Sequence, residues 1–216
     1  SWDDYLLADV LVQLPHQTAM SWTTLYCRPS IVPLSLPERP VVRFQTLENE
    51  YLQVSIQPNG TLDVKNKRSG TAYRGLNLFT DEADIGDAYL FSPELTAKIW
   101  NSATSSPSIR IQQGALCTSA TLDWTYRRSP DEPEQSLRLT LSLRKNDPLL
   151  RFHLEIENRA GDHRLRVHFP TGFSCDESFA DSIFTVEAHP IRRRQPKPEA
   201  WVETESGCYA QKRFIY

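Results

Sequence analysis

The sequence lacks any apolar run long enough to cross a bilayer. Its apolar stretches, such as residues 10–12, are interrupted within a few positions, whereas a membrane-spanning helix needs about 20 apolar residues in succession. An excess of positive charge is also missing, because 24 Lys and Arg stand against 27 Asp and Glu, a net charge of −3. Such a balance gives a polyanion no general attraction. We therefore expect partners other than nucleic acid or membrane.

Several motifs that carry chemistry are absent. The four cysteines form no Cys-x-x-Cys pair and the five histidines show no His-x-His or His-x-x-x-His spacing, so the usual spacings of zinc and redox sites are missing. No Gly-x-Ser-x-Gly and no glycine-rich loop before a helix occurs. We expect no metal site and no catalytic residue within this chain.

Glycine is scarce and proline is common, with 8 and 15 residues respectively, which leaves few intervals for a helix of ordinary length. Strands are indicated directly by strict alternation over residues 137–143, where every odd position is leucine and every even one is polar. The pattern resumes over 150–156 and again over 164–169, which predicts a three-stranded meander. Upstream, residues 51–56 and 61–64 flank Pro58-Asn59-Gly60, whose Asn-Gly pair suits a type I′ hairpin turn.

These patterns predict an all-β fold, an antiparallel two-sheet β-sandwich, because each strand with one apolar face needs a second sheet to cover it. We expect a small N-terminal strand-rich piece and a Pro-rich linker over residues 1–40, followed by the sandwich over 41–216. The chain starts without Met or a secretory leader, and it stops in an apolar run at Phe214-Ile215-Tyr216. We therefore expect a piece of a longer, cytoplasmic protein, with the sandwich truncated at its C-terminus.

Two charged segments are candidate sites. The acidic segment at residues 81–87 has the composition to hold calcium or to supply paired carboxylates, but it lacks the spacing of an EF-hand loop, and a solvated loop is the favoured interpretation. The basic run Arg192-Arg193-Arg194, with Lys197, has the donors to grip an anion, and a solvated face is its alternative.

A set of short motifs occurs in order along the chain: LENEYL (47–52), PNGTL (58–62), KRSG (67–70), GLN (75–77), DIGDAY (84–89) with Phe91 and Pro93, and ADSIF (180–184). Together these motifs resemble the C-terminal β region of glycoside hydrolase family 38, the α-mannosidases. The resemblance extends over nearly the whole chain and is most specific from 47 to 93. It implies a sandwich of the galactose-mutarotase-like supersandwich type.

The resemblance also implies a function. In that family a separate α/β barrel carries the zinc, its ligands and the nucleophile of a retaining mechanism, so the barrel is the expected partner and zinc belongs to it. This chain is then expected to lend substrate-binding residues to the mannoside pocket, namely Tyr89, Asp87 and Arg193. Two other interpretations are a free-standing carbohydrate-binding module, which would display exposed coplanar aromatic rings, and a purely structural interdomain sandwich.

Overall fold

The computed structural model describes residues 10–14, 18–26, 45–87, 91–94, 99–191 and 215. Thirteen strands and one short 3₁₀ turn, η1 (Ser102–Thr104), make up the secondary structure of these residues, and no α-helix occurs among them. Within the same residues, no helix has the length and apolar character that a membrane span requires. The expected all-β class is confirmed.

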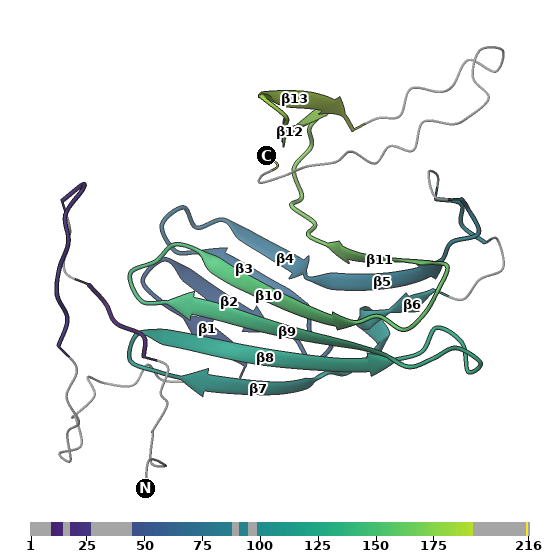
Figure 1. The fold of residues 1–216 in the computed structure, drawn as a ribbon, viewed down its shortest axis with the longest axis horizontal. Coiled ribbons are helices and arrows are strands. Elements are labelled where there is room, and N and C mark those ends of the chain that lie inside the picture. The colour runs from purple at the N-terminus through teal and green to yellow at the C-terminus, as the bar shows by residue number, and fades with distance from the viewer. Residues whose placement is uncertain are drawn as a thin grey trace, which may run out of the picture.

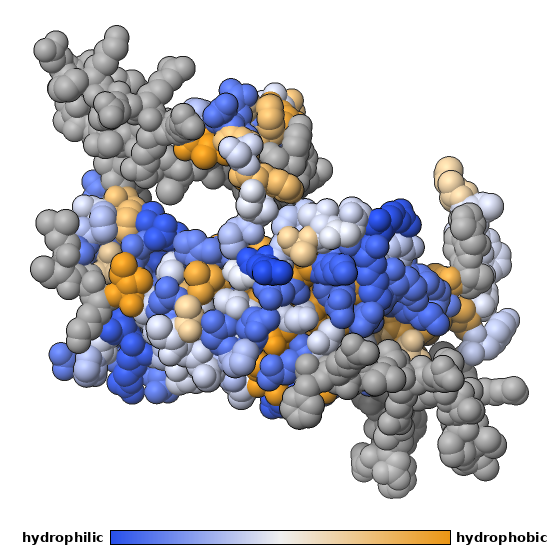
Figure 2. Space-filling model, turned by 180° about the vertical axis from the view of Figure 1, so that it is seen from behind, coloured by the Kyte–Doolittle hydropathy of each residue, from blue (hydrophilic) through white to orange (hydrophobic). Residues whose placement is uncertain are grey.

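The first layer is an antiparallel sheet with strand order β1-β2-β3-β4. Its strands are β1 (Thr46–Glu48), β2 (Leu52–Ile56), β3 (Leu62–Asn66) and β4 (Ala72–Leu76). In β2 the residues Leu52, Val54 and Ile56 are buried and alternate with half-buried polar residues, so one face of this sheet belongs to the core. Figure 2 shows the molecule from behind the view of Figure 1, and the surface on that side is mostly hydrophilic.

The second layer is an antiparallel sheet with strand order β10-β9-β8-β7, which lies in front of the first in Figure 1. Its strands are β7 (Ser108–Gln113), β8 (Cys117–Tyr126), β9 (Gln135–Arg144) and β10 (Leu150–Glu157). The four leucines at odd positions of β9 are almost fully buried, which confirms the face predicted from alternation. They form one core with the inward residues of the first sheet.

The predicted meander is wrong in its third strand. Strand β11 (His163–His168) pairs with β5 (Leu78–Ala83) and not with β10, and β6 (Trp100–Asn101) lies on the other side of β5. The turn between β10 and β11 carries the chain from one layer to the other, and β5 continues the line of β4 (Figure 1). Alternation indicates a strand with two different faces, but it does not indicate which sheet the strand joins.

The predicted hairpin between β2 and β3 is confirmed, and its turn type differs. The φ of Asn59 is not positive, whereas that of Gly60 is +83°. The Gly60 amide donates to the Gln57 carbonyl at 2.8 Å, which gives a type I turn followed by a left-handed glycine instead of type I′. Residue 60 must be glycine because a Cβ there would lie 2.2 Å from the Trp124 ring.

The remaining described residues form a C-terminal hairpin and two N-terminal segments. Strands β12 (Glu177–Ser182) and β13 (Thr185–Pro190) form a separate hairpin, and Ile215 forms a bridge with Ala180. Of the expected N-terminal piece, residues 10–14 and 18–26 are described and form no strand. The rest of residues 1–40, with the Pro-rich linker, lies outside the described residues.

Candidate functional site

One end of the sandwich holds a buried polar cluster centred on Asp81. Asp81 follows Phe79 at the inward positions of β5 and is fully buried. Its Oδ2 accepts a hydrogen bond from the Tyr126 hydroxyl at 2.7 Å, and its Oδ1 lies 2.8 Å from Nδ1 of His163. A buried carboxylate is costly unless it is paired, and here strands β5, β8 and β11 each supply one member of the cluster.

Tyr126 is held on two sides. Its ring stacks on Trp100 with centroids 3.6 Å apart, while its hydroxyl donates to Asp81. Burial, and then the hydrogen bond to the Asp81 carboxylate, raise the pKa of Tyr126 well above its ordinary value. The phenol therefore stays protonated at neutral pH and remains a donor.

Arg128 extends the cluster into the turns at this end. Its Nε lies 2.8 Å from Glu132 Oε2 and 3.9 Å from Asp81 Oδ1, and its Nη2 donates to the Gly161 carbonyl at 3.3 Å. The β8–β9 turn is thereby joined to the β10–β11 turn. The Nη1 atom of this buried guanidinium has no hydrogen-bond partner among the residues that the structure describes.

Asp84 closes the base of the loop that follows β5. Its Oδ1 accepts from the Gly86 amide at 2.9 Å and from the Ser92 amide at 3.0 Å, and the Ile85 amide donates to the Ser92 carbonyl at 2.9 Å. The amides of Ser92 and Gly86 hold the pKa of the Asp84 carboxyl below its usual value, because a hydrogen bond to the charged form favours that form. The loop is therefore fastened at both of its ends.

Arg164 of β11 makes a second attachment to the same loop. Its guanidinium lies over the Phe91 ring, 3.1 Å from the centroid, and its Nη2 is 2.9 Å from Glu82 Oε1. Arg166 pairs with the same Glu82 oxygen. The buried Glu82 thus orients two arginines, one of which lies over Phe91 of the loop.

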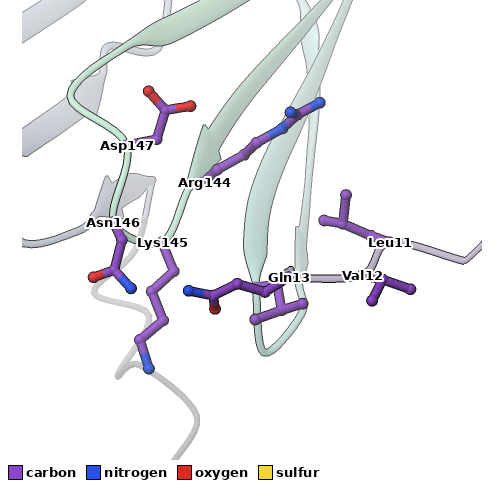
Figure 3. A pocket seen from close by; sticks show the side chains of 8 residues that line it. Leu11, Val12, Gln13, Arg144, Lys145, Asn146 and Asp147 are labelled. Carbon is purple, nitrogen blue, oxygen red and sulfur yellow. The ribbon is translucent and has the colours of Figure 1, made fainter. Parts of the chain in front are cut away.

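Two cavities lie at opposite ends of the sandwich. The first, of about 310 Å³, lies among the loop after β5, the β8–β9 turn and the β10–β11 turn, and is lined by polar groups that include Asp84, Arg128, Glu132 and Asp162. The second, of about 300 Å³, lies beside the β9–β10 turn. Figure 3 shows Leu11 and Val12 next to Arg144 at that second cavity.

The residues predicted for the sugar pocket are placed only in part. Asp87 is exposed, in the loop that Asp84 closes. Tyr89 and Arg193, with Arg192 and Arg194, lie outside the described residues. The prediction of a solvated loop over 81–87 is wrong at its start, because Asp81 and Glu82 belong to β5 and are buried. Asp81 lies two positions after the buried Phe79 on the same strand, so its side chain also points into the core.

Sequence reasoning missed the buried cluster formed by Asp81, Tyr126, Arg128 and His163. One signal was present: Tyr126 continues the even-numbered inward series of β8 after Leu122 and Trp124. Tyr126 and His163, the partners of Asp81, lie 45 and 82 residues after it in the sequence. No local pattern indicates pairs so far apart.

Neither a metal-binding cluster nor an aromatic platform occurs among the described residues. These bring together no group of three His, Cys, Asp or Glu that could hold a metal ion, so this part of the chain does not fit a zinc site. Of the three described tryptophans, Trp124 is buried, Trp100 stacks on Tyr126 and Trp22 is exposed. They form no shared platform for a sugar ring.

Comparison with known proteins identifies relatives of one kind. Residues 47–216 match the model of the glycosyl hydrolases family 38 C-terminal domain. A protein from Halalkalibacterium halodurans, whose name assigns it provisionally to mannosylglycerate hydrolysis, is 28% identical over an alignment 171 residues long. The alignment covers 67% of this chain and 19% of that protein.

Two solved structures have the same fold. An α-mannosidase from Enterococcus faecalis V583 superimposes with a TM-score of 0.65 and 25% identity, over 70% of this chain and 20% of that one. A family 38 glycosyl hydrolase from Enterococcus faecalis gives a TM-score of 0.64 and 25% identity, over 72% and 21% of the two chains. The chain spans about a fifth of the length of these relatives.

Proposed function

This chain belongs to glycosyl hydrolase family 38 as its C-terminal domain, and from this membership we propose that it serves an enzyme that hydrolyses α-mannosidic bonds. The family match over residues 47–216 is the observation that carries the proposal. A solved relative is an α-mannosidase and a sequence relative is named for mannosylglycerate hydrolysis. The substrate class is therefore a small α-mannoside.

The reaction itself is assigned to an attached catalytic barrel, located in a cytoplasmic protein. This barrel would supply the nucleophilic carboxylate of a retaining mechanism and would hold the zinc ion. The described residues of this chain do not fit a zinc site. The relatives are about five times longer than the matched region, which leaves room for such a domain.

The contribution of this chain to the pocket comes from the loop after β5. Asp84 fastens the loop at its base, and Asp87 is exposed in the described part of this loop. In the proposal, the Tyr89 hydroxyl donates to the sugar or to the nucleophilic carboxylate and favours the charged transition state. Asp87 accepts from a substrate hydroxyl, and Arg193 pairs with an acidic group of the barrel or of the substrate.

Removing the Tyr89 hydroxyl tests this role. In the full-length enzyme we expect Tyr89→Phe to lower turnover of an α-mannoside about 10-fold or more, because one charge-assisted hydrogen bond is lost in the transition state. Steady-state kinetics measure the change, and thermal unfolding checks that the variant is folded. Tyr73→Phe, on β4 with its ring edge-on to Phe173, is the matched control and should turn over normally. Normal turnover of Tyr89→Phe would leave this chain as a scaffold.

A panel of substrates tests the sugar class. The full-length enzyme should prefer α-mannosides over β-mannosides and over α-glucosides, and mannosylglycerate belongs in the panel because of the named relative. A clear preference for another sugar would contradict the proposed activity.

A further inference from the structure

Strand β10 forms a free edge of the second sheet. Its eight residues pair with β9 without a bulge, and among the described strands β9 is its only neighbour (Figure 1). The backbone groups on the other side of β10 therefore face no strand within the described part of the chain. An unpaired edge is a template for a further strand, and proteins commonly block it with proline, lysine or a bulge. None of these occurs in β10.

The inward side chains of β10 are left exposed at this edge. Phe152 and Ile156 are 40% and 49% exposed, although they lie directly opposite Leu141 and Leu137 of β9, which are almost fully buried. At the other edge of the same sheet, the inward isoleucines of β7 are half-buried against the core. Large apolar side chains beside an unpaired backbone edge indicate a surface that another strand covers.

The outward face of β10 carries basic residues in its first half and acidic residues in its second half. Arg151 and His153 come first, and Glu155 and Glu157 follow at the same alternate positions. All four side chains reach the solvent, and their ion pairs in the described structure join residues no more than four apart in the sequence. Exposed pairs of this kind contribute little to stability, so they leave the four side chains available for a new pairing.

An antiparallel copy of β10 matches these charges in one register. When Leu154 lies opposite Leu154 of the second copy, Arg151 lies opposite Glu157 and His153 lies opposite Glu155, and each pair occurs twice. A shift by two residues, the smallest step that keeps both faces aligned, sets His153 against His153 in one direction and Glu155 against Glu155 in the other. Opposite charges stabilise a cross-strand pair and like charges destabilise it, which selects the register centred on Leu154.

We propose that the β10 edge is a dimerisation surface and that its partner is a second copy of this chain, with the two β10 strands antiparallel about a two-fold axis at Leu154. The same register sets Phe152 opposite Ile156 on the inward face, so each copy covers the exposed apolar side chains of the other. A strand of any sequence can pair with the backbone of β10, whereas the charges favour an antiparallel copy of β10 itself. Such a contact closes at two copies. This inference does not depend on the activity proposed above.

Charge reversal tests the surface in the full-length enzyme. Sedimentation velocity should give the parent twice the mass of one chain. The acidic-edge variant, Arg151→Glu with His153→Glu, and the basic-edge variant, Glu155→Lys with Glu157→Lys, should each be monomeric, because every cross-strand pair then joins like charges. An equal mixture of the two should restore the dimer, since each acidic position lies opposite a basic one.

A matched control changes the same charge at the other edge of the sheet. Arg110→Glu with Gln112→Glu alters two exposed residues of β7 and should leave the dimer intact. Thermal unfolding shows whether each variant is folded. A parent that stays monomeric would overturn the inference, and slow amide exchange over residues 150–157 in that monomer would show that another part of the enzyme covers the edge. A dimeric acidic-edge variant, or a mixture that stays monomeric, would also overturn it.

A cysteine cross-link tests the register. Residues directly opposite one another in an antiparallel pair have Cα atoms about 4.5 to 5.5 Å apart, within the range that a disulfide bridges. Leu154→Cys should therefore give a covalent dimer under mild oxidation, above the background that the native cysteines give in the parent. Phe152→Cys is the control, because the register sets it opposite residue 156, and it should stay at background. Cross-linking at Phe152→Cys in place of Leu154→Cys would overturn the proposed register.

Discussion

Asp81 shows how one residue organises an end of the molecule. A fully buried carboxylate would be strongly destabilising alone, and Asp81 instead receives the Tyr126 hydroxyl, lies against His163 and faces Arg128. Removing one partner of such a group leaves the desolvation cost without its compensation. The cluster therefore stabilises the fold only while it is complete.

Tyr126→Phe should lower the free energy of unfolding by about 1 to 3 kcal/mol, because Asp81 loses a donor in a place that water does not reach. The ring and its stacking on Trp100 are kept, so the change reports on the hydroxyl. Urea unfolding measures it, and Tyr73→Phe on β4 serves as the control with little effect. Equal stability of the two variants would show that the Tyr126 hydroxyl contributes nothing net.

Gly60 meets two requirements, of which the sequence predicts only one. The Asn-Gly pair correctly predicts a turn between β2 and β3, because glycine adopts positive φ without strain. The approach of Trp124, 2.2 Å from where a Cβ would be, comes from the other sheet. This requirement depends on how the sheets pack, which local sequence does not contain.

At the scale of elements, hydrophobic alternation predicts where strands lie, but it predicts poorly which strands pair with one another. Strand β9 was predicted with its buried face, and its pairing with β10 follows from the short turn at Asn146-Asp147-Pro148. Strand β11 has the same kind of pattern and yet joins β5 in the other layer. The loop after β5 was predicted only as an acidic, solvated segment over residues 81–87, and its closure was not predicted, because the closure depends on hydrogen bonds from backbone amides to the Asp84 side chain.

Asn49 joins the two sheets at the other end. Its Nδ2 donates to the carbonyls of Arg144 and Asp147 at 2.7 and 2.8 Å, and its Oδ1 accepts from the amides of Tyr51 and Leu52. Four backbone groups from two turns thus depend on one side chain. The turn over Arg144 and Asp147 is the one drawn in Figure 3.

Asn49→Ala should therefore destabilise the protein more than Asn66→Ala. The Asn66 side chain accepts from the amides of Arg68 and Ser69 within its own turn, whereas the Asn49 side chain also makes two bonds between the sheets. We expect a difference of about 2 kcal/mol, at roughly 1 kcal/mol for each added bond. Denaturant unfolding of both variants measures it. Similar losses would mean that the link between the sheets is energetically neutral.

At the scale of the whole molecule, the two ends of the sandwich differ in kind. One end is closed by Asn49 between two backbone turns, and the other carries the Asp81 cluster and the fastened loop. A two-sheet body with a loop fastened at its base suits a domain that supports chemistry performed elsewhere. Family membership is consistent with this, because the chain spans about a fifth of its relatives.

The 216-residue chain by itself should therefore hydrolyse no α-mannoside, while the full-length enzyme does. The physical reason is that a retaining glycosidase needs two carboxyl groups about 5 Å apart on the two sides of the scissile bond. The described acidic residues at the base of the loop after β5 already make other interactions. Asp84 holds backbone amides, and Glu82 pairs with Arg164 and Arg166. Release of a chromogenic aglycone from an α-mannoside measures turnover, with added zinc and without it. Cooperative unfolding of the chain, followed by circular dichroism, shows that the sample is folded. Zinc-dependent turnover that persists through repurification of the folded chain would place the reaction within these 216 residues and contradict the division of labour proposed here.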